Sequence, residues 1–178
     1  VRNLIQSFSL VACLLTLALH AHAQTPTVGV ITADYDMAPG YTLFAPNSSS
    51  DTYLIDNCGR EINSWTNSQY APGSSVYLLE DGSLLRTCRI LNPNFTLGGQ
   101  GGRVERWSWN DSLMWSYDFS TTTYTQHHDI EPMPNGNFLL LAVESKKGLE
   151  PTTAGRNPML IANNAVWTDF IVEIKPIG

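Results

Sequence analysis

Basic residues and cysteine are both scarce in this sequence. Ten lysines and arginines stand against 16 aspartates and glutamates in 178 residues, which gives a formal net charge of −6. A chain of this charge offers no positive surface for nucleic acid or for an anionic membrane, so we expect neither as a partner. There are three cysteines, and no spacing of cysteine and histidine resembles a zinc site, so we expect no metal and no cofactor.

Long apolar runs are also rare, and the clearest, Leu10–Leu19, lies close to the start. It follows Arg2 and precedes Ala21-His22-Ala23, the small-x-small pattern at which signal peptidase cleaves. The run is too short for a membrane anchor, which needs about 20 residues. We therefore expect a signal peptide over residues 1–23, cleaved after Ala23, and a secreted or periplasmic protein without a membrane span.

A lipoprotein box, Leu10-Val11-Ala12-Cys13, is the alternative interpretation of the same region, with Cys13 acylated. It would leave the very apolar segment Leu14–Leu19 directly behind the lipid, which disfavours it.

No stretch of the remaining chain shows a good helical stripe. Short alternating or β-branched runs are separated instead by turn residues, a pattern typical of strands. Asp81-Gly82 and Asn135-Gly136 are strong hairpin signals, and Asn57-Cys58-Gly59 and Asn110-Asp111-Ser112 mark two further turns. We therefore predict an all-β fold.

The turns divide the predicted strands into repeated four-stranded units. The first unit contains Thr52–Asp56, Glu61–Trp65, Val76–Glu80 and Ser83–Thr87, and the second Arg103–Trp109, Leu113–Asp118, Asp129–Met133 and Phe138–Val143. Four-stranded units that recur about every 40–50 residues are typical of β-propeller blades.

The repeat predicts blade one over about 41–90, blade two over about 103–144, a long linker over 145–169 and the start of a third blade over 170–178. Because a closed ring needs at least four blades, we expect residues 24–178 to be the N-terminal part of a longer propeller. A small two-sheet sandwich is the alternative.

This blade arrangement places Cys58 in the first turn and Cys88 at the far end of the fourth strand. At about 3.3 Å per residue the two lie near 20 Å apart, beyond the reach of a disulfide. We expect the two thiols not to bond to each other.

The densest group of reactive side chains lies at His127 and His128, which are followed closely by Asp129 and Glu131. Paired imidazoles beside carboxylates suit nucleophilic, acid–base or metal chemistry. The alternative is a purely structural role, in which one histidine points into the sheet and hydrogen-bonds a backbone carbonyl.

The long linker predicted after blade two carries Arg156, which the blade arrangement puts on the same rim as the histidines. A guanidinium next to imidazoles suits the binding of phosphate, sulfate or carboxylate. Arg86 and Arg89 are predicted at that rim as well, as solvated charges.

Five segments resemble the bacterial arylsulfotransferases, in particular the secreted aryl-sulfate sulfotransferases. The resemblance runs from about Val28 to Gly178 and is carried by Tyr41–Pro46, Tyr53–Asp56, Leu79–Arg86, His127–Pro132 with Asn135-Gly136-Asn137, and Gly155–Pro158.

The resemblance implies a six-bladed propeller, in the periplasm or outside the cell, that transfers a sulfuryl group from a phenolic sulfate ester to another phenol through a sulfohistidine. It implies that His128, and less so His127, supports catalysis by binding sulfate or moving a proton, and that Arg156 clamps the sulfuryl oxygens. The covalently modified histidine is expected beyond Gly178, so this chain alone is expected to be inactive.

Two other functions remain open. A non-catalytic secreted propeller that binds a partner or displays loops would suit the acidic composition and the long linker equally well. Another propeller enzyme, a hydrolase or lyase with a bound metal, would suit the paired histidines.

Overall fold

The computed structural model describes residues 30, 32–96 and 98–177. The predicted signal peptide, residues 1–23, therefore lies outside the described residues. Strands make up 48% of the chain and helices 7%, which confirms the all-β class. Within the described residues, no helix combines the length and the apolar character that crossing a membrane requires.

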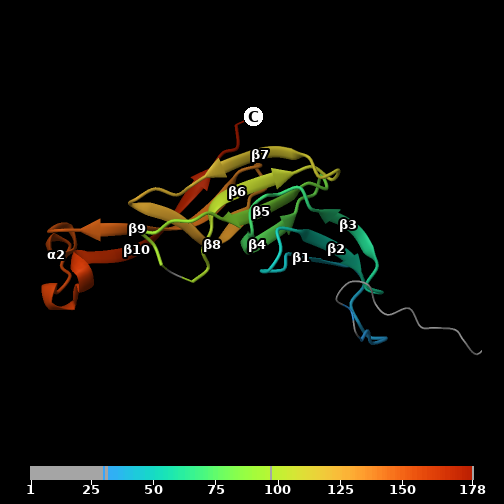
Figure 1. Ribbon diagram of the computed structural model, residues 1–178, viewed down its shortest axis with the longest axis horizontal. Coiled ribbons are helices and arrows are strands. Elements are labelled where there is room, and N and C mark those ends of the chain that lie inside the picture. Colours follow the sequence, from blue (N-terminus) through green and yellow to red (C-terminus); the bar gives the residue numbers. More distant parts are fainter. Residues whose placement is uncertain (1–29, 31, 97, 178) are drawn as a thin grey trace, which may run out of the picture.

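The strands form three antiparallel sheets. The first sheet contains β1 (Tyr41–Phe44), β2 (Thr52–Asp56) and β3 (Glu61–Trp65). The second contains β4 (Pro72–Leu78), β5 (Leu84–Arg89), β6 (Gly102–Trp107) and β7 (Leu113–Asp118). The third contains β8 (Tyr124–Pro132), β9 (Phe138–Lys147) and β10 (Ala165–Ile174). The molecule is elongated, with β1–β3 at one end and the tip of the β9–β10 hairpin at the other (Figure 1).

The predicted hairpin turns are confirmed. Asp81-Gly82 closes the β4–β5 hairpin, where the Leu79 amide donates to the Ser83 carbonyl oxygen at 2.8 Å. Asn135-Gly136 closes the β8–β9 hairpin in the same manner, with Gly136 at a φ of 82°. Such positive φ values are what glycine supplies without steric cost.

The strands group differently from the predicted blades one and two. The second sheet joins the last two strands predicted for blade one with the first two predicted for blade two, and β5 pairs with β6 from Leu84↔Trp107 to Arg89↔Gly102. The segment 66–71 does not close a β3–β4 hairpin because its polar groups serve other elements. Its Ser68 hydroxyl and Tyr70 carbonyl, for example, accept hydrogen bonds from Arg86 on β5.

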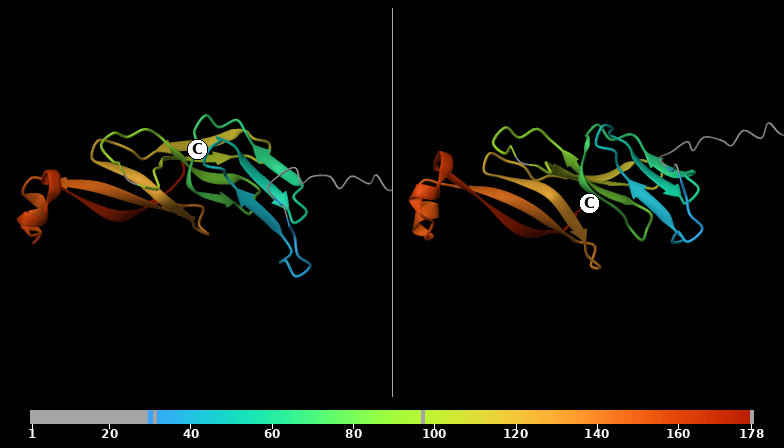
Figure 2. Two further views of the ribbon diagram at one scale, coloured as in Figure 1. Left: turned by 60° about the horizontal axis from the view of Figure 1, so that its bottom comes forward. Right: turned by 90° about the horizontal axis from the view of Figure 1, so that it is seen from below.

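The predicted linker over 145–169 is also wrong. Strand β9 continues to Lys147, and β10 returns beside it from Ala165↔Lys147 to Ile174↔Phe138. Strand β10 is therefore the third strand of the β8–β9 sheet rather than the first strand of a new unit. The loop itself is shorter, 148–164, and holds α2 (Glu150–Thr153), η1 (Pro158–Leu160) and η2 (Ala162–Asn164). The views in Figure 2 show this hairpin extending away from the other sheets.

The main apolar core lies between the second and third sheets. Its buried residues come from β5, β6, β8, β9 and the β7–β8 connection, and they are Leu85, Val104, Phe119, Ile130, Phe138, Leu140 and Ala142. Packing of Ile130 and Leu140 in this core fixes the middle of β8 against the neighbouring sheet.

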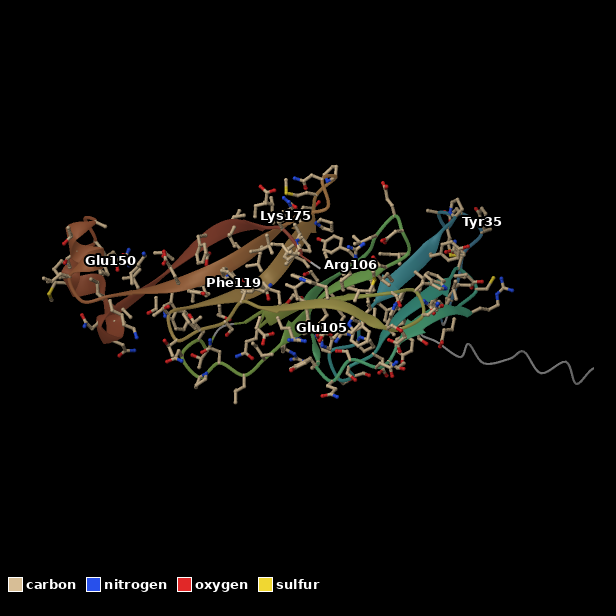
Figure 3. All side chains as sticks on the ribbon, turned by 90° about the horizontal axis from the view of Figure 1, so that it is seen from above. Tyr35, Glu105, Arg106, Phe119, Glu150 and Lys175 are labelled. Carbon is tan, nitrogen blue, oxygen red and sulfur yellow. The ribbon has the colours of Figure 1, made fainter. Side chains whose placement is uncertain are left out.

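Arg86 is buried, not a solvated charge at a rim as expected. Its guanidinium donates to the carbonyl oxygens of Ser50 and Tyr70 at 2.7 and 2.6 Å and to the Thr52 hydroxyl at 2.9 Å. These bonds tie the first sheet to the second, and Figure 3 shows Glu105, which lies 4.0 Å from Arg86, in this central region. Because the charge is hydrogen-bonded on every side, its burial is tolerated.

The two cysteines of the described residues lie in different surroundings. Cys58 is exposed in the β2–β3 turn, Cys88 is buried in β5, and both are free thiols. Burial raises the pKa of the Cys88 thiol to about 12. A thiol so strongly kept in its protonated form is a poor nucleophile.

Candidate functional site

The two histidines lie in an irregular stretch of β8. Pairing with β9 stops at Gln126↔Ala142 and resumes at Ile130↔Leu140, so three residues of β8 face a single residue, Leu141. A bulge of this kind bends the strand and redirects its side chains, and bulges are over-represented next to active sites.

The backbone of His128 takes up the distortion. Its φ is 53°, in the left-handed region that few residues other than glycine adopt. Non-glycine residues held in this region cluster at functional sites, where the surrounding structure enforces them. The bulge and the positive φ together make this part of β8 a candidate functional site.

The glycine-rich connection before β6 holds the bulge in place. The His128 amide donates to the Gly99 carbonyl oxygen at 2.7 Å, and Gln100 forms an isolated bridge with His127. Gly99 has a φ of 62°, and a Cβ built on it would lie only 2.4 Å from the His128 ring. A glycine is therefore required here for the imidazole to pack against the backbone.

The imidazoles contact each other through their Nδ1 atoms, which lie 2.7 Å apart, with the ring planes nearly perpendicular. His127 is buried and His128 is exposed. On the far side of His127, its Nε2 atom lies 3.2 Å from Oδ1 of Asp169 on β10. The carboxylate is out of line for a hydrogen bond, so this contact is electrostatic.

His128 and Asp129 line an open groove of about 510 Å³ whose other wall is Ser74–Tyr77 on β4. The Tyr77 hydroxyl donates to Asp129 Oδ1 at 3.2 Å and lies 3.4 Å from Glu131 Oε2. Burial and these carboxylates raise the pKa of Tyr77 to about 12, so its hydroxyl stays protonated. The groove therefore holds an imidazole and a neutral phenol donor within one surface.

The structure does not bring Arg156 to the histidines. Arg156 is exposed in the loop after α2, at the tip of the β9–β10 hairpin. Along β9, Lys147, where the strand ends, lies six positions beyond Leu141, which faces the bulge. At about 3.3 Å per residue this corresponds to about 20 Å. In Figure 3, Glu150 of α2 marks this tip, well away from the central strands.

Asp169 and Tyr77 are site residues that the sequence analysis missed. Each stands in a strand otherwise rich in apolar or small residues, and an acidic residue within the apolar run of β10 was the available signal for Asp169. Asp169 reaches His127 only because β10 pairs with β9. The sequence analysis predicted a linker over 145–169 and therefore no strand at Asp169.

The described part of the chain contains no group of three or more histidine, cysteine, aspartate or glutamate side chains placed to hold a metal ion. His128, Asp129 and the Tyr77 hydroxyl instead line the groove as hydrogen-bonding groups, with His127 in contact behind His128. Comparison of the chain with protein-family models, with curated proteins and with solved structures finds no match.

Proposed function

We propose that this chain is part of an arylsulfotransferase, which moves a sulfuryl group from a phenolic sulfate ester to another phenol. The observation that carries the proposal is the contacting pair of His127 and His128, held in a strained bulge at the edge of a groove. The export that residues 1–23 predict would place this activity in the periplasm or outside the cell.

The arrangement of the sheets supports a propeller for the whole protein. The first strands of the three sheets are neighbours, since β4 contacts both β1 and β8. In a propeller the first strand of each blade lies innermost, next to the central channel. With β4–β7 as one complete blade and β8–β10 as three strands of the next, the groove beside His128 would open toward that channel.

Sulfuryl transfer between two phenols requires a group that takes up and releases protons. The bond between sulfur and the aryl oxygen breaks as sulfur bonds to a histidine, which the resemblance places beyond Gly178, and the departing phenolate takes up a proton. An acceptor phenol then bonds to sulfur and loses its proton as the sulfur–nitrogen bond breaks. The exposed imidazole of His128 can accept the proton of the acceptor phenol, and the departing phenolate takes its proton from water.

Of two further groups, only Tyr77 has a role beside His128 in this proposal. Because the Tyr77 hydroxyl donates its proton to Asp129, its oxygen can accept a hydrogen bond from the O–H of an acceptor phenol in the groove. Arg156, predicted as the clamp for the sulfuryl oxygens, lies at the hairpin tip and is given no contact with the sulfuryl group beside His128 in this proposal.

The test uses the protein expressed from its complete reading frame, with 4-nitrophenyl sulfate as donor and phenol as acceptor. Release of 4-nitrophenolate is followed by absorbance, and phenyl sulfate is identified by mass spectrometry. We expect His128→Ala to lower kcat about 10²- to 10⁴-fold, the usual contribution of a general acid–base group. Arg156→Ala is compared with Lys147→Ala, an exposed cation near the same hairpin tip.

Unchanged turnover in His128→Ala would refute the role given to the histidine. No phenyl sulfate from the unaltered protein would refute the transfer and favour a binding or display module. A stoichiometric transition metal in the purified protein would favour a metal-dependent hydrolase or lyase instead.

A further inference from the structure

We propose that Asp169 is a positioning residue that sets the tautomers of both histidines, so that His128 carries its proton on Nδ1 and presents a bare Nε2. The use of this nitrogen in sulfuryl transfer rests on the proposed function. The tautomers themselves follow from the geometry alone.

The contact between the rings admits only one proton. A neutral imidazole has one N–H donor and one acceptor nitrogen. The two Nδ1 atoms lie 2.7 Å apart, which is hydrogen-bond distance, so one of them donates and the other accepts. Two arrangements satisfy this condition, and they differ in which histidine donates.

In the first arrangement, His127 donates from Nδ1. Its Nε2 then carries a lone pair that faces the Asp169 carboxylate oxygen at 3.2 Å. His127 is buried, so water does not solvate its Nε2 lone pair, and although the Asp169 side chain is largely exposed, the contact between the two acceptors is unfavourable.

In the second arrangement, His127 carries its proton on Nε2, toward the carboxylate, and its Nδ1 accepts from His128. The electrostatic contact with Asp169 is then attractive, and His128 is left with an unprotonated Nε2. A carboxylate that orients an imidazole and fixes its tautomer in this way is a recurrent device in catalysis.

The surroundings strengthen this choice. Nε2 of His127 has no hydrogen-bond partner among the described residues, so no other contact competes with the carboxylate. Asp169 lies within a continuous pairing of β10 with β9, opposite Val143, which fixes its place. The imidazole of His128 is packed against Gly99, which restricts its rotation.

The bare nitrogen of His128 suits one step of the proposed reaction. As the oxygen of an acceptor phenol bonds to sulfur, its O–H bond breaks and an N–H bond forms at Nε2 of His128. The proton then passes from Nε2 to water, so the imidazole returns to its starting form with a bare Nε2.

Long-range ¹H–¹⁵N NMR spectra of the ¹⁵N-histidine-labelled chain test the assignment, because they distinguish protonated from bare ring nitrogens. His127→Gln and His128→Gln variants identify the signals. We expect a proton on Nε2 of His127 and on Nδ1 of His128. Asp169→Ala should shift both residues toward the opposite or a mixed tautomer, whereas Asp169→Asn should retain the original state only in part, since its amide oxygen keeps a partial negative charge but not the full charge of the carboxylate.

Glu173→Ala is the matched control, because it removes another exposed carboxylate of β10 that lies away from the histidines, beside Asn135 and Asn137. It should leave the histidine spectrum unchanged, and backbone amide spectra establish that each variant is folded. A proton on Nε2 of His128 in the unaltered chain, or unchanged tautomers in folded Asp169→Ala, would overturn the proposal.

Kinetics of the complete protein separate this inference from the proposed function. If both hold, Asp169→Ala lowers kcat more than it changes KM, and Asp169→Asn restores part of the loss. If the NMR result holds but the protein transfers no sulfuryl group, the tautomer assignment stands and the sulfotransferase proposal fails.

Discussion

Arg86 offers a sharp test of what holds the first two sheets together. We consider Arg86→Met, which keeps an unbranched side chain of similar reach and removes the charge and all donors. The guanidinium donates to two backbone carbonyls, to the hydroxyls of Thr52 and Ser68, and to the Cys88 sulfur. The side chain is only 1% exposed. The substitution therefore leaves several buried acceptors without partners.

The size of the effect follows from these contacts. Each hydrogen bond to a charged group contributes about 1.5–3 kcal/mol, and the buried methionine recovers part of the loss through its apolar surface. Removing one partner of a buried charged network typically costs about 3–5 kcal/mol. That cost is a large share of the total stability of a domain, which is about 5–15 kcal/mol.

Urea unfolding followed by tryptophan fluorescence measures this change, since Trp65 and Trp107 pack in one apolar cluster and Trp107 donates to Glu105, which lies 4.0 Å from Arg86. With an m value of about 2 kcal/mol per M, a loss of about 4 kcal/mol moves the midpoint by about 2 M. Arg89→Met is the control on the same strand. Arg89 is exposed, and its side chain has one hydrogen bond, to the Asn47 carbonyl oxygen, so its loss should cost under about 1 kcal/mol. Equal midpoints for the two variants would refute the structural role of the Arg86 contacts.

Three further predictions concern Gly99, the Glu105 carboxylate and the thiols of Cys58 and Cys88. Gly99→Ala should displace the His128 ring and shift its NMR signals, because a Cβ there would lie 2.4 Å from that ring; an unchanged His128 spectrum would contradict the contact. Although burial raises the pKa of Glu105, hydrogen bonds from neighbouring side chains outweigh it and lower that pKa below the usual 4.5. Its contribution to stability is thus complete above about pH 4.5 and is lost as pH falls through the lower folded value, so Glu105→Gln should flatten the acid side of the stability–pH curve measured by urea unfolding. In folded protein cleaved after residue 23, a thiol reagent should modify Cys58 and reach Cys88 only in denaturant; fast modification of both would show that Cys88 is accessible.

Much of the local structure was predictable because it depends on neighbours in the chain. Asp81-Gly82 and Asn135-Gly136 specify tight hairpins through their backbone preferences, and both turns lie where expected. The paired histidines were also recognisable as candidate functional residues, since their chemistry is visible in the residue types alone.

The grouping of strands into sheets was not predictable in the same way. Strand β6 pairs with β5 and β10 pairs with β9 across connections whose path depends on tertiary contacts. The prediction that Arg156 shares a rim with the histidines depended on the predicted grouping of strands into blades. Because the strands group differently, Arg156 lies instead at the tip of the β9–β10 hairpin.

The amino-acid sequence by itself determined the all-β class, the turns and the chemical character of the His127–His128 segment, because short-range backbone preferences and residue types settle these features. Only the tertiary structure decided that Arg86 is buried, that His127 lies between His128 and Asp169, and that His128 opens onto a groove. These relations join residues as far apart as Ser74 and His128, 54 positions along the chain, and they arise because each sheet must bury its apolar face against a neighbour.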